Sequence, residues 1–477
     1  MTVIRPNSIS GINSITANGG DINLFRADGT KADIPIVNNI TAGVITATSF
    51  SGSGANLTSI PAGNLTGTVA DARLTTVSSS KLSGALPALD GSALTGVGIG
   101  TDGSVNTSGI VTATSFVSNT PFSNRNRVIN GGMLINQRAS SYTATGEEYL
   151  LDRFNHRTGS GFTFDTTTTQ STSAPDGFTK SLKITPDSTQ TPSGSHNGMI
   201  GHLIEADNLL GFASGTSSAK SFALSFYAKS ASQNNNHQYS VQLSKKNSGG
   251  TYYYQNRSFV VTSSWQRFTV VFPADTSNNI ATGNGEGLRI LWHLSAGPDD
   301  IASAVTSWTS SNGNHAVTGQ SNFMDNTSNE FYLTGVQLEV GPVATPFEHR
   351  SFGDELIRCK RYFNMVADGS EARSGSSRSE GVIGNGFFWS SSRMMVPVKF
   401  QVTMRTPDWT LYKKNGEYRY YANGGSNQTC TQNDIGLNGQ EGLNSAHLNI
   451  TNISSSSAAG MFFVHDVNAA LGFDAEL

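Results

Sequence analysis

Charge, cysteine and long apolar runs are all scarce in this sequence. Only 14% of the 477 residues are charged and the formal net charge is −3, whereas globular proteins average about 25% charged residues. The concentrated basic surface that nucleic-acid binding needs is therefore missing. No apolar run reaches the ~18 residues of a membrane-spanning helix, so we expect no membrane insertion. The N-terminus has no apolar signal segment, and we expect synthesis in a cytoplasm.

Metal-ligating patterns are missing as well. The two cysteines, Cys359 and Cys430, give no disulfide framework and no metal-ligand spacing. The nine histidines contain no His-x-His or His-x₃-His pair. We therefore predict no cofactor. A structural Ca²⁺ held by backbone carbonyls and carboxylates stays open, with Asp299, Asp300 and Asp325 as candidate ligands.

What the sequence does contain is glycine and small polar residues. Glycine accounts for 51 residues, and Ser, Thr and Asn fill much of the remainder. Such a chain lacks the high content of Glu, Lys, Ala and Leu that is typical of a helical protein. We therefore predict an all-β protein.

Composition changes near residue 122. Residues 1–122 hold only four aromatics and no histidine, whereas the rest of the chain holds the other 39 aromatics and all nine histidines. The segment also repeats, because the pattern at 41–50 (TAGVITATSF) returns at 107–116 (TSGIVTATSF). One such unit cannot bury enough apolar surface to offset its ordering entropy. We predict a fibrous shaft of repeats whose interior is shared by sister chains; the alternative is a disordered linker.

Two further regions follow. Residues 123–349 contain runs with period-two alternation, such as Phe222, Leu224 and Phe226, separated by Asn, Gly and Ser clusters, and this is typical of a β-sandwich. The run at 331–340 is apolar on both faces, as in a central strand. Ser351 followed by Asp354 resembles a helix capping box. Beyond it, strand-like runs predict a smaller distal β-domain over 350–477.

Three stretches resemble bacteriophage tail-fibre proteins, particularly those of phages that infect cyanobacteria. They are the repeat at 43–50 (GVITATSF), the run at 126–138 (NRVINGGMLINQR) with DRF at 152–154, and the run at 331–341 (FYLTGVQLEVG) with ATPFE at 344–348 and RCKRYF at 358–363. The resemblance implies a carbohydrate-binding-like jelly roll in a homotrimeric virion protein. It also implies attachment to other tail or baseplate proteins at one end and contact with the host envelope at the other.

Two arginines and a glycine pair stand out in the second of these stretches. Arg138 and Arg153 lie in an otherwise nearly uncharged framework, so we expect them to be buried partners of carboxylates such as Asp152 or Glu339. Gly131-Gly132 predicts a turn or a bulge.

Enzymatic chemistry has little support in the sequence. The G-x-G-x-x-G match at 98–103 precedes β-branched repeats and not a helix, which argues against a nucleotide site. A tailspike-type glycan hydrolase would need two carboxylates across a cleft, and candidates are Glu147, Glu148, Asp152, Asp299, Asp300 and Glu339. No G-x-S-x-G elbow is present. We expect no enzyme and keep the hydrolase as an alternative.

Glycan binding needs only exposed aromatic faces with amide, carboxylate or arginine side chains beside them. Clusters of this kind supply the candidate residues Tyr418, Tyr420, Tyr421, Trp389, Tyr253 and Trp308. Tyr420 and Tyr421 are adjacent, so at most one points inward on a regular strand, and the distal cluster is therefore preferred. For each cluster the competing interpretation is strand core or an interface between copies.

Together these observations predict a virion tail-fibre protein that adsorbs to host surface polysaccharide through multivalent binding. Residues 1–122 would form the attachment and shaft region, 123–349 the jelly roll, and 350–477 the receptor-binding tip. The alternative is a purely structural tail, baseplate or collar fibre without receptor binding.

Overall fold

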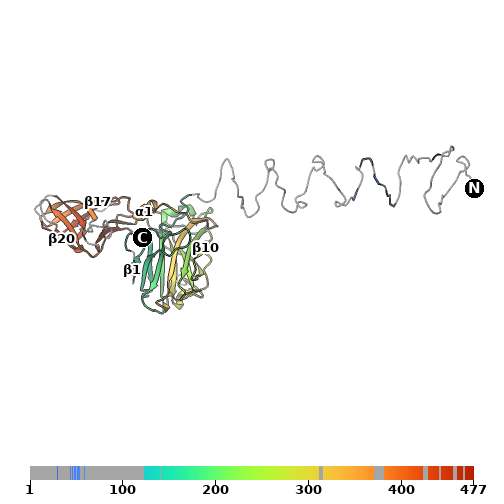
Figure 1. Ribbon diagram of the computed structural model, residues 1–477, viewed down its shortest axis with the longest axis horizontal. Helices are drawn as coiled ribbons and strands as arrows, with labels where there is room; N and C mark the ends of the chain where they lie inside the picture. Colours follow the sequence, from blue (N-terminus) through green and yellow to red (C-terminus); the bar gives the residue numbers. More distant parts are fainter. Residues whose placement is uncertain are drawn as a thin grey trace, which may run out of the picture. The chain divides into compact units, whose positions relative to one another are not determined.

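The computed structural model describes a few positions between 30 and 59 and most of residues 123–477 (Figure 1). Within the latter range it omits 140, 145, 311–314, 370–380, 423–427, 440–441, 455–458 and 466–467. The chain divides into two units, Met1–Val111 and Thr112–Leu477. The predicted shaft repeats lie almost wholly outside the described residues, so the shaft, its sister chains and the boundary at 122 stay predictions.

The second unit begins with a sandwich of two antiparallel six-stranded sheets (Figure 1). The first sheet has the order β1 (Ser141–Ala144), β4 (Thr166–Ser171), β5 (Ser181–Pro186), β14 (Phe331–Val340), β7 (Phe222–Ser230) and β10 (Gln266–Phe272). The second has the order β2 (Glu148–Tyr149), β3 (Phe154–Gly159), β6 (Asn197–Glu205), β11 (Glu286–Ala296), β8 (Gln238–Lys246) and β9 (Tyr252–Val260). The predicted all-β jelly-roll sandwich is confirmed.

Alternating side chains of the two sheets form the core between them. Phe222, Leu224 and Phe226 of β7 are fully buried, and from the opposite sheet Trp292 of β11 packs edge-on against Phe226 at 5.7 Å between ring centroids. The expected central strand is also confirmed, because β14 pairs with β5 and β7 and all ten of its residues are buried.

Short elements close the ends of this sandwich. They are the 3₁₀ helices η6 (Ala206–Phe212), η7 (Pro298–Asp300) and η8 (Phe323–Asp325), and the parallel pair β12 (Ile301–Ala302) and β13 (Ala316–Val317). Tyr254 of β9 also forms a bridge with Thr309. The described segment around Thr309 therefore lies beside β9, the edge strand of the second sheet.

Helix α1 (Phe352–Lys360) separates the sandwich from the distal strands. The predicted cap is confirmed, since the Ser351 side chain accepts a hydrogen bond from the Asp354 backbone N–H at 3.1 Å. Among the described residues no helix has the length and apolar character needed to cross a lipid bilayer.

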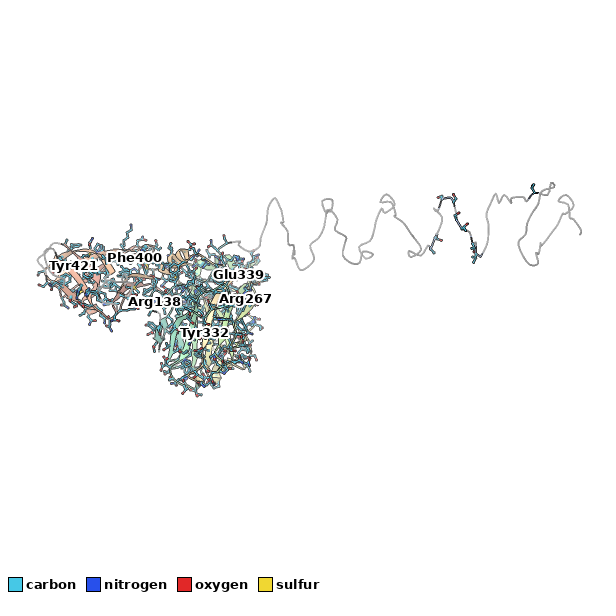
Figure 2. All side chains as sticks on the ribbon, viewed as in Figure 1. Arg138, Arg267, Tyr332, Glu339, Phe400 and Tyr421 are labelled. Carbon is cyan, nitrogen blue, oxygen red and sulfur yellow. The ribbon has the colours of Figure 1, made fainter. Side chains whose placement is uncertain are left out.

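The distal region is all-β, as expected. A three-stranded sheet has the order β15 (Phe363–Asp368), β24 (Ala470–Asp474) and β18 (Thr410–Lys413). A seven-stranded sheet has the order β20 (Gln428–Cys430), β19 (Tyr418–Ala422), β23 (Ala459–Val464), β16 (Gly381–Ser390), β17 (Arg393–Lys399), β22 (Ser445–Ile450) and β21 (Ile435–Leu437), and η10 spans Gln432–Asp434. Its own hydrophobic cluster includes Phe400, Phe462 and Phe473; Phe400 and Tyr421 are labelled in Figure 2.

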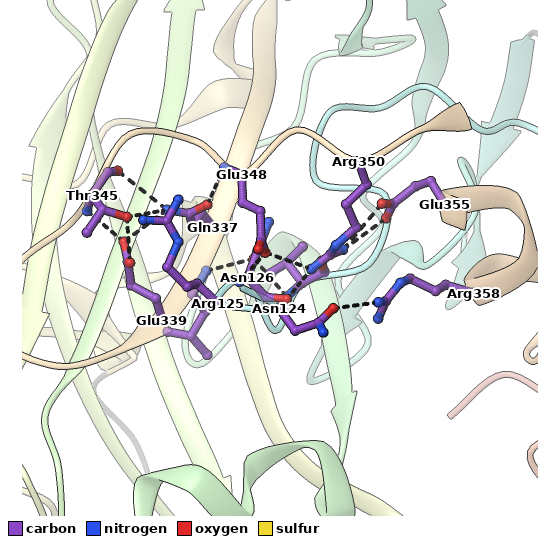
Figure 3. A network of polar contacts seen from close by, with 12 residues as sticks. Asn124, Arg125, Asn126, Gln337, Glu339, Thr345, Glu348, Arg350, Glu355 and Arg358 are labelled. Carbon is purple, nitrogen blue, oxygen red and sulfur yellow. Dashed lines mark hydrogen bonds and ion pairs between the residues drawn. The ribbon is translucent and has the colours of Figure 1, made fainter. Parts of the chain in front are cut away.

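Polar contacts join residues 124–126 to β14 and to the chain that follows it (Figure 3). The Asn126 backbone N–H donates to Glu348 at 2.9 Å, and its side chain donates to the Val336 carbonyl at 3.0 Å. Arg350 pairs with Glu355 of α1 at 3.3 Å. Asn126, the first residue of the 126–138 run, is thus bonded both to β14 and to the chain that follows it.

The two expected buried arginines are found, with partners that only partly match the expectation. Arg138 lies 3.9 Å from Asp152, but 3.0 Å from Asp474, and Arg153 pairs with Glu476. Glu339 is no partner of either arginine, because it accepts hydrogen bonds from Gln337 and Thr345. The sequence did not reveal these ties because the C-terminal acids are more than 320 residues from the arginines.

Candidate functional site

The outer face of the second sandwich sheet carries polar side chains where its inner face is apolar. In β11, Leu288, Ile290, Trp292 and Leu294 point into the core, and because strand residues alternate, Arg289, Leu291 and His293 point the other way. Gln242 of β8 and Arg157 of β3 also point away from the core. Period-two alternation therefore builds a row of polar groups across strands that are distant in sequence.

These outward side chains line a cleft of about 260 Å³. Its apolar part includes Met199 and Leu291, which are 7% and 6% exposed. Its polar lining includes Arg157, Asn197, Gln242, Ser244, Arg289 and His293, with Tyr252, Tyr254 and His315 also contributing. An apolar surface with convergent polar groups is the usual composition of a small-molecule site.

Two arginines at the cleft are each paired with a carboxylate. Arg289 makes a two-pronged ion pair with Glu286, at 2.5 and 2.9 Å, and its guanidinium lies 4.2 Å from the ring centroid of Tyr252. Arg157 pairs with Glu147 at 2.9 Å. Burial, and then the Glu286 charge, raises the pKa of Tyr252 to about 12, so its hydroxyl keeps its proton. Because each arginine is paired with a glutamate, its N–H groups can donate hydrogen bonds to a ligand while the pair carries little net charge.

Asp300 organises another part of the cleft lining. It accepts a hydrogen bond from Asn197 Nδ2 at 3.0 Å and pairs with His315 Nδ1 at 2.6 Å. The His315 ring is stacked over His293, with 6.0 Å between centroids. His293 Nε2 lies 2.8 Å from Gln242 Oε1. Asp300, which does not line the cleft, therefore orients Asn197, whereas the cleft residues Gln242 and His315 orient His293.

Two buried acceptors of this network have no hydrogen-bond partner among the described residues, Asn197 Oδ1 and His293 Nδ1. Asn197 is 6% exposed and His293 1% exposed, and both line the cleft. A buried polar atom without a partner costs free energy. A ligand that hydrogen-bonds to these atoms would recover it.

The structure does not bring the six sequence-predicted residues together. Tyr418 and Tyr420 lie in the distal core at 0% and 1% exposure, where the Tyr418 hydroxyl donates to the Ala470 carbonyl at 2.8 Å and Tyr420 bonds Ser454. These two tyrosines therefore offer no face to a ligand in this structure. The prediction that only one of Tyr420 and Tyr421 points inward holds, since Tyr421 stacks on Phe463 at 4.8 Å on the other face.

The other predicted residues lie at separate places. Trp389 is 69% exposed on β16, beside Phe387. Trp308 donates its indole N–H to the Pro273 carbonyl and packs against core Phe222 at 5.4 Å. Tyr253 lies on β9 next to the cleft residue Tyr252, but its ring is 5.9 Å from Lys245 and it does not line the cleft. The ligand roles of Trp389, Tyr421 and Tyr253 stay predictions.

Sequence reasoning missed the cleft itself, including Arg289, Asn197 and His293. A signal was present, because the strands that supplied the core pattern carry Arg, Gln and His at the intervening positions. It was weak, since no single strand contributes more than a few of the lining residues.

Comparison with known proteins gives only distant likenesses. No protein-family model and no curated protein sequence matches the chain. Among solved structures, the family 11 carbohydrate-binding module of the cellulase Lic26A-Cel5E of Clostridium thermocellum is 13% identical, over 44% of this chain and 99% of that one, with a TM-score of 0.22. The CBM22-1 xylan-binding domain of Paenibacillus barcinonensis Xyn10C is 10% identical, over 43% and 94%, with a TM-score of 0.23.

A further likeness is to the enzymatically active domain of bacteriophage CBA120 tailspike protein 4. It is 13% identical, over 45% of this chain and 21% of that one, with a TM-score of 0.23. With TM-scores near 0.2, none of these likenesses supports a statement about activity or partners.

Proposed function

We propose that the chain binds glycan in the cleft on the outer face of the β3–β6–β11–β8–β9 sheet. The observation that carries the proposal is the pairing of an apolar floor with buried, pre-oriented polar groups, two of which lack partners. A sugar ring has apolar C–H faces and hydroxyl groups around its edge, so it can satisfy both kinds of surface.

The cleft is proposed to bind without cleaving. Each carboxylate close to it is engaged by another side chain: Glu147 by Arg157, Glu286 by Arg289, and Asp300 by Asn197 and His315. These acids hold the binding groups in place. Hydrolysis would instead need one carboxyl group free to donate a proton to the leaving oxygen.

The biological setting we propose is a homotrimeric phage tail fibre, located in the virion tail, that adsorbs to host surface polysaccharide. The repeats and the aromatic-poor composition of residues 1–122 support this setting. A mass measurement of the full chain in native buffer tests it: three times the chain mass agrees with the proposal, and a single folded chain contradicts the fibre.

Tyr252→Ala should weaken glycan binding by roughly tenfold, because an aromatic contact contributes about 1.5 kcal/mol at most beyond its area. Binding of the full chain to xylan, to β-1,3-1,4-mixed-linked glucan and to polysaccharide extracted from candidate hosts can be measured by calorimetry. Phe352→Ala is the matched control, since Phe352 is 61% exposed on α1 and outside the cleft.

The exposed Trp389 on β16 of the distal region provides the decisive comparison. If Trp389→Ala abolishes binding and Tyr252→Ala leaves it unchanged, the receptor site is on β16 and the cleft proposal is wrong. The absence of binding to every polysaccharide at millimolar sugar would also contradict it.

A further inference from the structure

The polar groups of the cleft are not distributed at random. Asn197 Oδ1 and His293 Nδ1 are acceptors that belong to the network around Asp300, whereas Arg157 and Arg289 are donors paired with Glu147 and Glu286. Donor and acceptor functions are therefore carried by different side chains, each with a fixed orientation.

The acceptor character of Asn197 is set by its neighbours. Its Nδ2 donates to Asp300 Oδ2 at 3.0 Å, and a carboxylate oxygen can only accept. The amide therefore cannot reverse without losing this bond, and Oδ1 stays an acceptor. Gly159 leaves the space for it, because a Cβ there would lie 2.4 Å from Asn197 Oδ1.

The acceptor character of His293 follows from its tautomer. Nε2 faces Gln242 Oε1, which accepts, so the ring proton is on Nε2 and Nδ1 carries a lone pair. Burial, and secondly the neighbouring His315, lowers the pKa of His293 to about 3. The ring is therefore neutral at physiological pH, and Nδ1 cannot become a donor.

We infer that Asn197 and His293 make the cleft selective for sugars that present free hydroxyl donors, and that they exclude O-methylated and acidic sugars. This inference rests on the proposed glycan-binding function. A free hydroxyl donates to each orphan acceptor. A methyl ether cannot donate. A carboxylate or sulfate places further acceptors opposite these acceptor atoms and near the charge of Asp300, and the two cleft arginines are already neutralised by Glu147 and Glu286.

The test uses an array of defined oligosaccharides in which one backbone occurs in free, O-methylated and uronic-acid forms. The wild-type full chain should bind the free form at least about tenfold more tightly than the other two, because a site built to hydrogen-bond a hydroxyl leaves its groups unpaired with an analogue that lacks it. His293→Phe should weaken binding of the free form by about tenfold and remove most of the discrimination.

A second variant guards against loss of folding in His293→Phe. Gly159→Ala introduces a Cβ into the space of Asn197 Oδ1 and should weaken binding of the free form similarly. Gly146→Ala is the matched control, since a Cβ there meets nothing within 4 Å, and its binding should equal wild type. Thermal melting reports whether each variant is folded.

The outcomes separate the inference from the function on which it rests. Equal binding of free and O-methylated forms, with binding still weakened about tenfold in Tyr252→Ala, overturns the selectivity and keeps the glycan site. Tighter binding of the uronic-acid form also overturns it. Failure of wild type to bind any member of the array contradicts the proposed function itself.

Discussion

Arg153→Met should destabilise the protein by about 3–5 kcal/mol, the usual cost of breaking a buried ion pair on one side. The Arg153 side chain is 1% exposed and pairs with Glu476, which is 4% exposed. Its guanidinium also lies 3.6 Å from the ring centroid of Tyr362. Methionine fills much of the volume of the arginine side chain, but it removes the positive charge that offsets the cost of burying the Glu476 carboxylate. Chemical denaturation followed by circular dichroism measures the loss.

The site also links the sandwich to the distal strands, so a second effect is expected. Arg153 belongs to the sandwich, and Glu476 follows β24. We therefore expect the distal β-region to unfold at lower denaturant than the sandwich in the variant. Arg419→Met is the matched control, because its ion pair with Glu417 is partly exposed and should be worth less than about 1 kcal/mol. Equal losses in the two variants would refute the role given to Arg153.

Gly131→Ala should cost about 3 kcal/mol through a steric clash with the backbone. A Cβ on Gly131 would lie 2.1 Å from the Val336 carbonyl oxygen, and the Val336 N–H donates to the Gly131 carbonyl at 2.9 Å. Two backbone segments thus approach each other closely, and no side-chain rotation relieves the contact. The midpoint of thermal unfolding should fall.

The neighbouring Gly132 is the matched control, because replacing it tests whether the loss of glycine flexibility alone explains the effect of Gly131→Ala. A Cβ on Gly132 would have its nearest neighbour, Leu134 Cγ, at 3.8 Å, an ordinary van der Waals distance. Gly132→Ala should therefore change the unfolding midpoint little. If the two substitutions cost the same, the contact with Val336 is not the reason that glycine occupies position 131.

The strand pattern carried most of the fold information. Runs such as Tyr239, Val241 and Leu243 are fully buried as expected, because a sheet with one covered face requires alternation. The helix at 352–360 followed from its cap. The partners of Arg138 and Arg153 could not be predicted, since pairing with the C-terminal acids depends on tertiary contacts across the chain.

The candidate site was much less accessible to sequence reasoning. Adjacent aromatics drew attention to Tyr418 and Tyr420, but aromatic side chains on strands also form cores, and both tyrosines do so here. The cleft instead combines two or three residues from each of five strands with His315 from a connection. Only strand order and register bring them together, and neither is encoded in local spacing.

The central claim is that the outer face of the sheet containing β11 binds glycan. A crystal structure of the full chain soaked with an oligosaccharide that it binds tests this claim most directly. We predict sugar density over Leu291 and Tyr252, with hydroxyl groups within hydrogen-bond distance of Asn197 Oδ1 and His293 Nδ1. Sugar density on β16 beside Trp389, with the cleft holding only water, would contradict the claim.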